Sequence, residues 1–184
     1  SNTLAVRLEN RPQSSRWYPG AGLYRNVHLI VTDKIHVPVW GTQITTPHVS
    51  KEFAAVRLQT RIDNAGEKTQ IRMETEILSP DGKVVTRKEN TGRINHGQPF
   101  EQNFIVNAPE LWSPENPSLY KAVSKIYANN KLVDTYTTRF GIRSIEFIAD
   151  KGFYLNGEHR KFQGVCNHHD LGPLGAAINV AALR

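Results

Sequence analysis

The strongest constraint on the fold of this chain is an alternation of apolar and polar residues with a period of two. In Phe53–Asn64, every second residue from Val56 to Ile62 is apolar or a threonine, while the residues between are charged or carry an amide. The segment Gln70–Leu78 repeats this pattern. Successive side chains of a β-strand point to opposite faces, so the alternation predicts strands with one buried face.

Turn signals separate further segments of the same kind. Asp81-Gly82 predicts a tight turn into Lys83–Lys88, and Asn129-Asn130 predicts another, because these residues tolerate a positive φ. The other expected strands are one within Ile35–Thr46, then Gln98–Asn107, Leu119–Tyr127 and Leu132–Phe140. About seven strands in roughly 110 residues are typical of a two-sheet sandwich of immunoglobulin type. We therefore expect an all-β fold built on an immunoglobulin-like β-sandwich.

Composition argues against several partners. The formal net charge is +6, but the basic residues are spread, with Arg57 and Arg61 at alternate positions of one strand. A nucleic-acid surface gathers Lys and Arg on one face, with aromatic residues placed to stack on bases. No apolar run approaches the roughly 20 residues that span a bilayer. We therefore expect no nucleic acid and no membrane as partners.

The single cysteine, Cys166, rules out an internal disulfide framework, so the fold must rest on its apolar core. Cys166 follows an apolar segment, and its neighbours in the sequence give no sign of an activated thiol. We expect it to be buried and unreactive.

The segments on either side of the sandwich have a different character. The first 32 residues hold a loop rich in Gly, Pro and aromatic residues, followed by an apolar strand at Val27–Val31. After the sandwich, Asn156-Gly157 is a strong hairpin signal, and Lys161–Val165 has the composition of a strand. Gly175–Arg184 is the first helix-like stretch. This order predicts a single opening β/α unit in a chain truncated at both ends.

Four segments together resemble glycoside hydrolase family 2, and within it the β-galactosidases. They read SRWYPGAGLYR at 15–25, ELWSPENPSLY at 110–120, FGIR at 140–143 and FYLNGEHRKFQGVCNHHDLGPLG at 153–175. The resemblance covers the whole chain. It implies the end of a jelly-roll, sugar-binding-like domain at 1–32, the immunoglobulin-like sandwich at 33–142, and the truncated start of a (β/α)8, or TIM, barrel at 143–184.

The resemblance also implies an activity for the parent protein, the hydrolysis of terminal β-D-galactosides with retention. A retaining glycosidase uses two carboxyl groups about 5–5.5 Å apart. By resemblance, both glutamates lie on later barrel strands beyond Arg184, so this segment holds no catalytic residue and should be inactive alone. Within the chain, Glu74 and Glu76 lie on a strand and Glu115 in a proline-rich loop, and none forms a convincing pair. The resemblance implies a divalent cation and sodium for the parent, and no cofactor for this segment.

Asn167, His168 and Asp170 are the candidate substrate-binding residues. They follow the expected first barrel strand, at whose C-terminal end substrate groups bind in such barrels. His168 keeps the register of the family's histidine, whereas its neighbours depart from the GVNRHEHHP form common in the galactosidases. Two alternatives stay open: Asp170 caps the following helix, or His168, His169 and Asp170 bind a metal. We expect no metal, because no further ligand cluster is evident.

Other functions remain open beside the galactosidase one. A β-glucuronidase-type relative is one, and an independent carbohydrate-binding or interaction sandwich is another. A carbohydrate-binding module needs an exposed aromatic platform, and the aromatic residues of the strands are mostly flanked by core candidates. We expect Arg16, Trp17 and Tyr18 to pack against the sandwich rather than to bind sugar, and Trp112 to plug the core.

The expected partners are the β-galactoside substrate of the parent protein and its own jelly-roll and barrel domains. Homo-oligomerisation stays open. The compartment is unknown, with the bacterial periplasm and the cytoplasm both open.

Overall fold

The structure is a computed structural model that describes residues 3–9, 11–13, 22–23, 27–95, 97–166 and 179–183. Contacts group residues 31–162 into one compact unit, and residues 1–30 with 163–184 into another. The strands are β1 (Ile35–His36), β2 (Thr42–Val49), β3 (Phe53–Asn64), β4 (Thr69–Leu78), β5 (Val84–Ile94), β6 (Gln98–Asn107), β7 (Tyr120–Ala128), β8 (Lys131–Phe140), β9 (Ile145–Ile148), β10 (Gly152–Leu155) and β11 (Glu158–Arg160). One short helix, α1 (Val180–Leu183), lies within the helix-like stretch.

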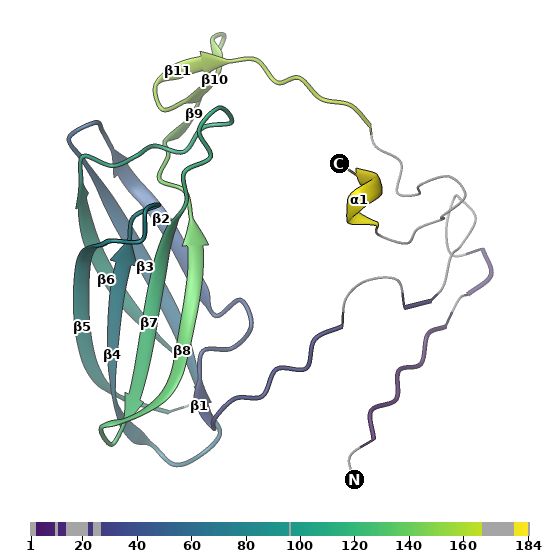
Figure 1. Cartoon of the computed structure of the whole chain (residues 1–184), viewed down its shortest axis with the longest axis vertical. Helices are drawn as coiled ribbons and strands as arrows, with labels where there is room; N and C mark the ends of the chain where they lie inside the picture. Colours follow the sequence, from purple (N-terminus) through teal and green to yellow (C-terminus); the bar gives the residue numbers. More distant parts are fainter. Residues whose placement is uncertain are drawn as a thin grey trace. The chain divides into compact units, whose positions relative to one another are not determined.

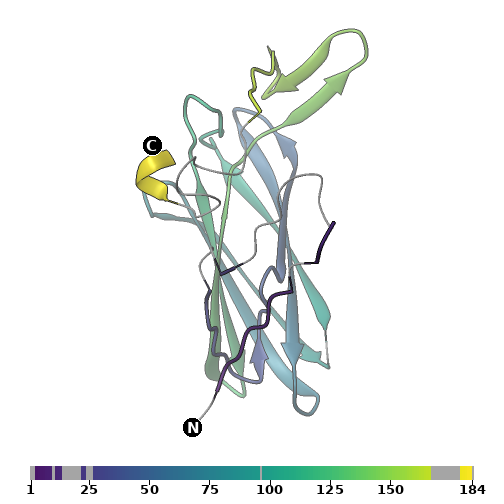
Figure 2. The ribbon, with the colours of Figure 1, turned by 90° about the vertical axis from the view of Figure 1, so that its right-hand side faces the viewer.

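Eight strands form a sandwich of two antiparallel sheets (Figures 1 and 2). In one sheet, β3 pairs with β6 on one side and with β1 and β2 on the other. The other sheet has the order β5-β4-β7-β8. A third sheet, in the order β11-β10-β9, lies at the end of the sandwich where β8 finishes (Figure 1). The expected all-β, immunoglobulin-like fold is therefore confirmed.

The alternation of the sequence becomes the core of this sandwich. The inward residues of β3 and β4 are buried, among them Leu58, Ile62 and Met73, and the residues between them are more exposed. One core cluster surrounds Phe104 and Leu58, and a second surrounds Met73 and Ile126. The period of two therefore places one apolar face of each sheet against the other.

Side-chain hydrogen bonds join the two sheets along both of their edges. On the β5/β6 side, Gln102 Nε2 donates to Asn90 Oδ1 at 2.9 Å. On the β1/β8 side, the backbone N–H of Val37 donates to Asp134 Oδ2 at 2.7 Å. Such bonds satisfy polar groups at the rim of the core, so both edges are held by side chains rather than by strand pairing.

The turn signals are confirmed by the backbone. Asn129 and Asn130 have φ values of 48° and 63°, and they join β7 to β8. Asn156 and Gly157, with φ values of 52° and 79°, form the turn between β10 and β11. Positive φ at both positions is what a two-residue hairpin turn requires, and Asn and Gly adopt it most readily.

Two expected strands do not form among the described residues. Val27–Val31 and Lys161–Val165 are exposed and carry no strand pairing. A strand needs a neighbour to bond its N–H and C=O groups, and neither segment has one here. The expectation of a buried Cys166 is also wrong, because this residue is exposed. The expected domain boundaries at 32 and 142 stay predictions.

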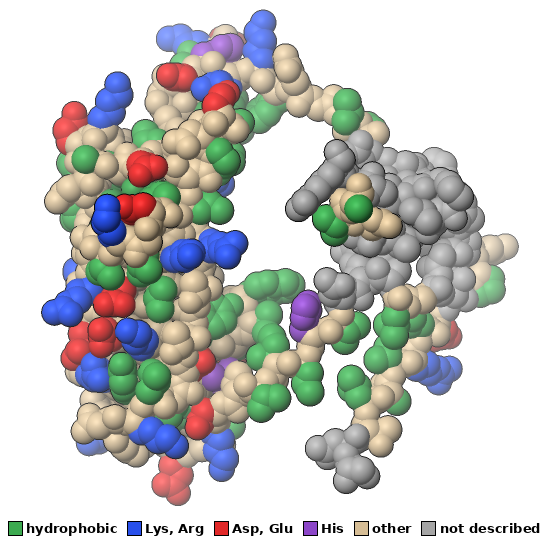
Figure 3. Space-filling model, viewed as in Figure 1, with side chains coloured by type: hydrophobic (Ala, Val, Ile, Leu, Met, Phe, Trp, Pro, Cys, Tyr) green, Lys and Arg blue, Asp and Glu red, His purple; other side chains and the backbone are tan. Residues whose placement is uncertain are grey.

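The outer face of the β5-β4-β7-β8 sheet carries interspersed charges of both signs (Figure 3). Arg72 lies 3.0 Å from Glu89 and 3.4 Å from Glu74, and its guanidinium lies over the ring of Tyr127. Lys125 lies 3.5 Å from Glu76. Basic residues paired in this way do not form the single-signed patch that nucleic acid needs. Among the described residues, no helix has the length and hydropathy to cross a membrane.

We predict that Phe104→Ala lowers the free energy of unfolding by about 3–5 kcal/mol, because it leaves a cavity where a fully buried ring now packs. The neighbouring Ile105, which is 51% exposed on the same strand, is the matched control. Ile105→Ala should change the stability by only about 0.5 kcal/mol. Urea unfolding of both variants measures this, and equal losses would contradict the assigned core.

Candidate functional site

The candidate site is the junction at which the sandwich ends and the β9–β11 sheet begins. Immediately after β8, Ile142 is fully buried in the core cluster of Phe104. Its backbone forms a parallel bridge with Leu111, and its carbonyl oxygen accepts from the N–H of Trp112 at 2.8 Å. The chain leaving the sandwich is thus tied by side chain and backbone to the loop between β6 and β7.

Trp112 packs directly on the backbone of Gly141. A Cβ atom on Gly141 would lie 2.8 Å from both Cβ and Cγ of Trp112, which is closer than packed carbon atoms approach. On the other side of the junction, the guanidinium carbon of Arg143 lies 4.8 Å from the centre of the Trp112 ring, within range of a cation–π interaction. Trp112 is half-buried, and its expected role as a plug of the core stays a prediction.

Asn156 joins three segments of this junction. Its side-chain Oδ1 accepts from the N–H of Ser144 at 3.0 Å, and its Nδ2 donates to the carbonyl of Trp112 at 3.0 Å. Its backbone N–H donates to the carbonyl of Ser144, also at 3.0 Å. Asn156, in the turn between β10 and β11, therefore bonds both Ser144, which directly precedes β9, and the loop between β6 and β7. The sequence predicted only a hairpin turn at this residue.

An ion pair links the same two segments near the surface. Arg160 Nη1 lies 2.7 Å from Glu115 Oε1. The pKa of Glu115 lies below its ordinary value, first because of a hydrogen bond from its own backbone N–H and then because of the Ser113 hydroxyl and Arg160. A lowered carboxyl pKa stabilises the fold above the unfolded-state pKa, and this contribution is lost as the pH falls through the lowered value. The pair is exposed, so its contribution is small.

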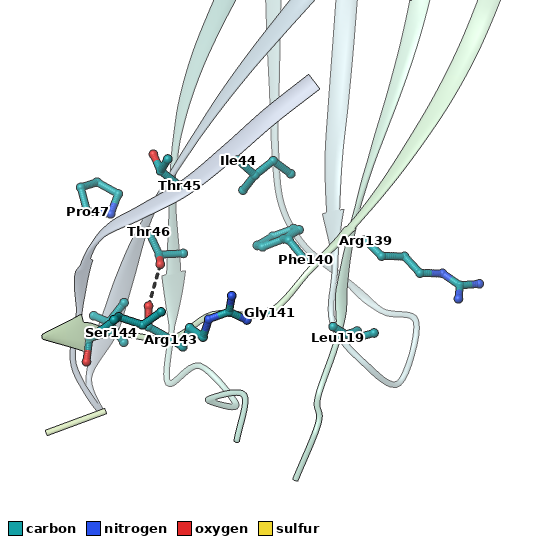
Figure 4. A pocket seen from close by; sticks show the side chains of 12 residues that line it. Ile44, Thr45, Thr46, Pro47, Leu119, Arg139, Phe140, Gly141, Arg143 and Ser144 are labelled. Atoms are coloured by element: carbon teal, nitrogen blue, oxygen red, sulfur yellow. Dashed lines mark hydrogen bonds between the residues drawn. The ribbon is translucent and has the colours of Figure 1, made fainter. Parts of the chain in front are cut away.

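A pocket of about 650 Å³ opens beside the junction, between the edge strands β2 and β8 (Figure 4). Ile44 on β2 and Phe140 on β8 lie close together in its lining, and the Arg139 side chain extends away from them. Polar contacts close the gap between the sheets on either side: Thr42 Oγ1 and Thr138 Oγ1 lie 2.8 Å apart, and Thr46 Oγ1 donates to the carbonyl of Arg143 at 2.8 Å. The wall continues through Ile145 onto β9.

An aromatic row extends from this pocket across the β9–β11 sheet. Ile145 and Phe147 share one face of the sheet, and Phe147 pairs across the strands with Phe153. The ring centres of Phe147 and Phe153 lie 5.2 Å apart, and those of Phe153 and Phe162 lie 4.6 Å apart. Phe147 and Phe162 are both largely exposed. Exposed apolar surfaces of this kind are typical of interaction sites.

The described residues contain no catalytic constellation. Glu74 and Glu76 lie on the outer face of the β5-β4-β7-β8 sheet and pair with Arg72 and Lys125. No group of three or more His, Cys, Asp or Glu residues in the described part of the chain could hold a metal ion. The contacts of the junction join the β9–β11 sheet to the end of the sandwich.

The sequence-predicted substrate residues Asn167, His168 and Asp170 lie outside the described residues, as does His169. Their role stays a prediction. Arg16, Trp17 and Tyr18 also lie outside the described part of the chain. The junction residues were missed as a site because their roles depend on contacts between residues 12 to 45 positions apart, which the order of the residues does not reveal.

The fold and the junction define a β-sandwich module with an anchored hairpin sheet at one end. Residues 37–143 match the Glycosyl hydrolases family 2. The chain belongs to this family.

Relatives and solved structures agree with this assignment. The whole chain is 41% identical to the β-galactosidase BoGH2A of Bacteroides ovatus and 36% identical to a putative β-glucuronidase of Formosa agariphila. It covers 22% and 17% of these proteins, so it spans about a fifth of the length of the curated relatives it matches. The structure of a family 2 glycosyl hydrolase from Bacteroides cellulosilyticus is also similar, with a TM-score of 0.85 and 36% identity. The match covers 91% of this chain and 22% of that protein's chain.

A calcium-binding mutant of Bacteroides uniformis β-glucuronidase 2 is a further similar structure. It is 29% identical, with a TM-score of 0.70 over 80% of this chain and 19% of that chain.

We predict that Gly141→Ala destabilises the protein by about 1–3 kcal/mol, because the added methyl group overlaps the Trp112 side chain. Gly164→Ala is the matched control, since no atom lies within 4 Å of the position its Cβ would take. Thermal unfolding compares the two. A stable Gly141→Ala variant would show that Trp112 does not pack on this backbone.

We also predict that Asn156→Gly lowers the free energy needed to open the β9–β11 sheet by about 1–3 kcal/mol. Glycine tolerates the turn's positive φ, so only the two side-chain hydrogen bonds are lost. Amide hydrogen exchange across β9–β11 measures the effect. Asn129→Gly is the control, because Asn129 also has a positive φ and its side chain bonds no described residue. Equal protection in both variants would exclude the anchoring role.

Proposed function

We propose that this chain is a non-catalytic scaffold of a retaining β-galactosidase, whose sandwich holds the catalytic barrel in a fixed orientation. The observation that carries the proposal is the junction, where Asn156 bonds both Ser144 and Trp112. A linker that only connected two domains would need no such contacts. The 41% identity to the Bacteroides ovatus β-galactosidase supports the choice of substrate class.

In this proposal, residues 1–32 end a jelly roll, 33–142 form the sandwich and 143–184 begin the barrel. The exposed row of Phe147, Phe153 and Phe162 then faces the barrel, which would bury it. His168, with Asn167 and Asp170, contacts the sugar at the end of the first barrel strand. A hydrogen bond from such a group strengthens as the oxocarbenium-like transition state forms.

The two catalytic carboxyl groups belong to the remainder of the longer protein in this proposal. A divalent cation would also be bound there, in keeping with the calcium-binding mutant of the Bacteroides uniformis relative. β-Glucuronidase activity is the second candidate, and it is favoured by the 36% identity over the whole chain to the Formosa protein.

The scaffold role predicts that these 184 residues show no hydrolysis of aryl β-galactosides or β-glucuronides by themselves. Grafted in place of the matching segment of BoGH2A, they should support hydrolysis of the galactoside. Asn156→Gly in this chimera should shorten its half-life at elevated temperature, because the barrel loses a fixed support, and should leave KM near the unmodified value.

Rates with both aryl glycosides, for the chain and for the chimera, measure this. Hydrolysis by the isolated chain that survives controls for host enzymes would contradict the scaffold role. A chimera with full thermal stability after Asn156→Gly would contradict the importance of the junction.

A further inference from the structure

Trp40 is an exposed tryptophan held in an unfavourable backbone conformation. It is 91% exposed, and its φ of 57° lies in the left-handed region, which costs a bulky residue conformational energy. The β1–β2 turn nevertheless holds it: the N–H of Gly41 donates to the carbonyl of Pro38 at 2.8 Å, and the N–H of Trp40 donates to Tyr136 Oη at 3.3 Å. A glycine would satisfy this turn better, so the ring serves something other than the fold.

Two shallow hollows run from Trp40 along the outer face of the β2-β3-β6 sheet. The first, of about 200 Å³, is lined by Trp40 together with Gln43, Gln59, Arg61 and Pro99, among others. The second, of about 110 Å³, adds Thr45 and Arg57 and shares both glutamines with the first. We call the two hollows together the outer-face groove. Because they share residues, a single extended ligand can occupy both.

The register of the sheet explains why these residues meet. Gln43 pairs with Gln59, and Thr45 pairs with Arg57, so all four side chains point out from the same face. Gln59 in turn pairs with Glu101 on β6. The groove therefore has a floor of planar amide and guanidinium groups, each with several hydrogen-bonding atoms. The Gln43 side chain bonds no described residue.

The charges of the groove are compensated within the sheet. Arg57 Nη2 lies 2.6 Å from Glu101 Oε2, and Arg61 Nε lies 3.7 Å from Asp63 Oδ1. Gln59 Nε2 also donates to Glu101 Oε2, at 3.2 Å. With each arginine beside a carboxylate, the groove offers little net attraction to an anion, and its complement is a neutral ligand rich in hydroxyl groups.

We infer that the outer-face groove binds a neutral saccharide, with one sugar ring stacked on the indole of Trp40 and its hydroxyl groups bonded by Gln43, Gln59 and the arginines. The indole presents a broad apolar face to the C–H groups of a sugar ring, while its N–H remains able to donate. This surface is separate from the junction. It would hold a polysaccharide on the sandwich while the chemistry takes place elsewhere.

Titration of the 184-residue chain with cellotetraose, xylotetraose and β-1,4-galactotetraose tests the inference, with tetragalacturonate as the acidic comparison. The indole N–H signals of the three tryptophans report the site by NMR. At least one neutral tetrasaccharide should shift the Trp40 signal saturably at millimolar concentration or below, and more tightly than the acidic one. No shift with any neutral saccharide, or stronger binding of tetragalacturonate, would overturn the inference.

Trp40→Gly separates a binding role from a structural one. It should raise the dissociation constant at least about tenfold, a loss of about 1.4 kcal/mol. Its melting temperature should be unchanged or higher, since glycine fits the left-handed backbone. Gln59→Ala should weaken binding in the same direction, and Phe147→Ala, which removes an exposed ring elsewhere, should leave it unchanged. A destabilised Trp40→Gly variant would show that the indole serves the fold, and a variant that binds as the unmodified chain does would show that the indole does not bind the saccharide. Either result would overturn the inference.

Discussion

The packing of Trp112 on the backbone of Gly141 determines where the sandwich stops and where the next sheet starts. Because Gly141 has no side chain, the Trp112 side chain can pack directly against the chain that leaves β8. This close approach allows the backbone N–H of Trp112 to donate to the carbonyl of Ile142, and the Trp112 carbonyl to accept from Asn156 Nδ2. The hairpin turn of β10 and β11 is thereby bonded to a loop some 44 positions earlier in the chain.

The junction combines contacts of different strength. The burial of Ile142 contributes most, since fully burying an aliphatic side chain stabilises a fold by about 1.5–3 kcal/mol. The two hydrogen bonds of the Asn156 side chain restrict how the joined segments are oriented, because each requires its donor and acceptor to be aligned. The exposed Arg160–Glu115 pair contributes little by comparison. Orientation is thus set by buried and half-buried groups, which salt in the surrounding solution hardly screens.

Much of the sandwich could be predicted because its strands carry their own signal. The alternation in Phe53–Asn64 matches β3 at both ends, and Asn156-Gly157 forms the expected turn. Two further segments have a composition equally typical of strands but do not form them: Val27–Val31 and Lys161–Val165. Strand formation depends on a pairing partner that the local sequence does not specify. Trp40 was missed for a related reason: nothing in its neighbours distinguishes an exposed ring from a buried one. The predicted residues Asn167, His168 and Asp170 lie outside the described part of the chain.

The central claim is that the sandwich and the β9–β11 sheet form one rigid body across the junction. Residual dipolar couplings of backbone amides in a weakly aligned sample test this most directly, because they report the orientation of each N–H bond in a common frame. A single alignment tensor should fit the couplings of β2–β8 and those of β9–β11 together. Couplings of β9–β11 that require a separate tensor, or that are strongly reduced in magnitude, would contradict the claim.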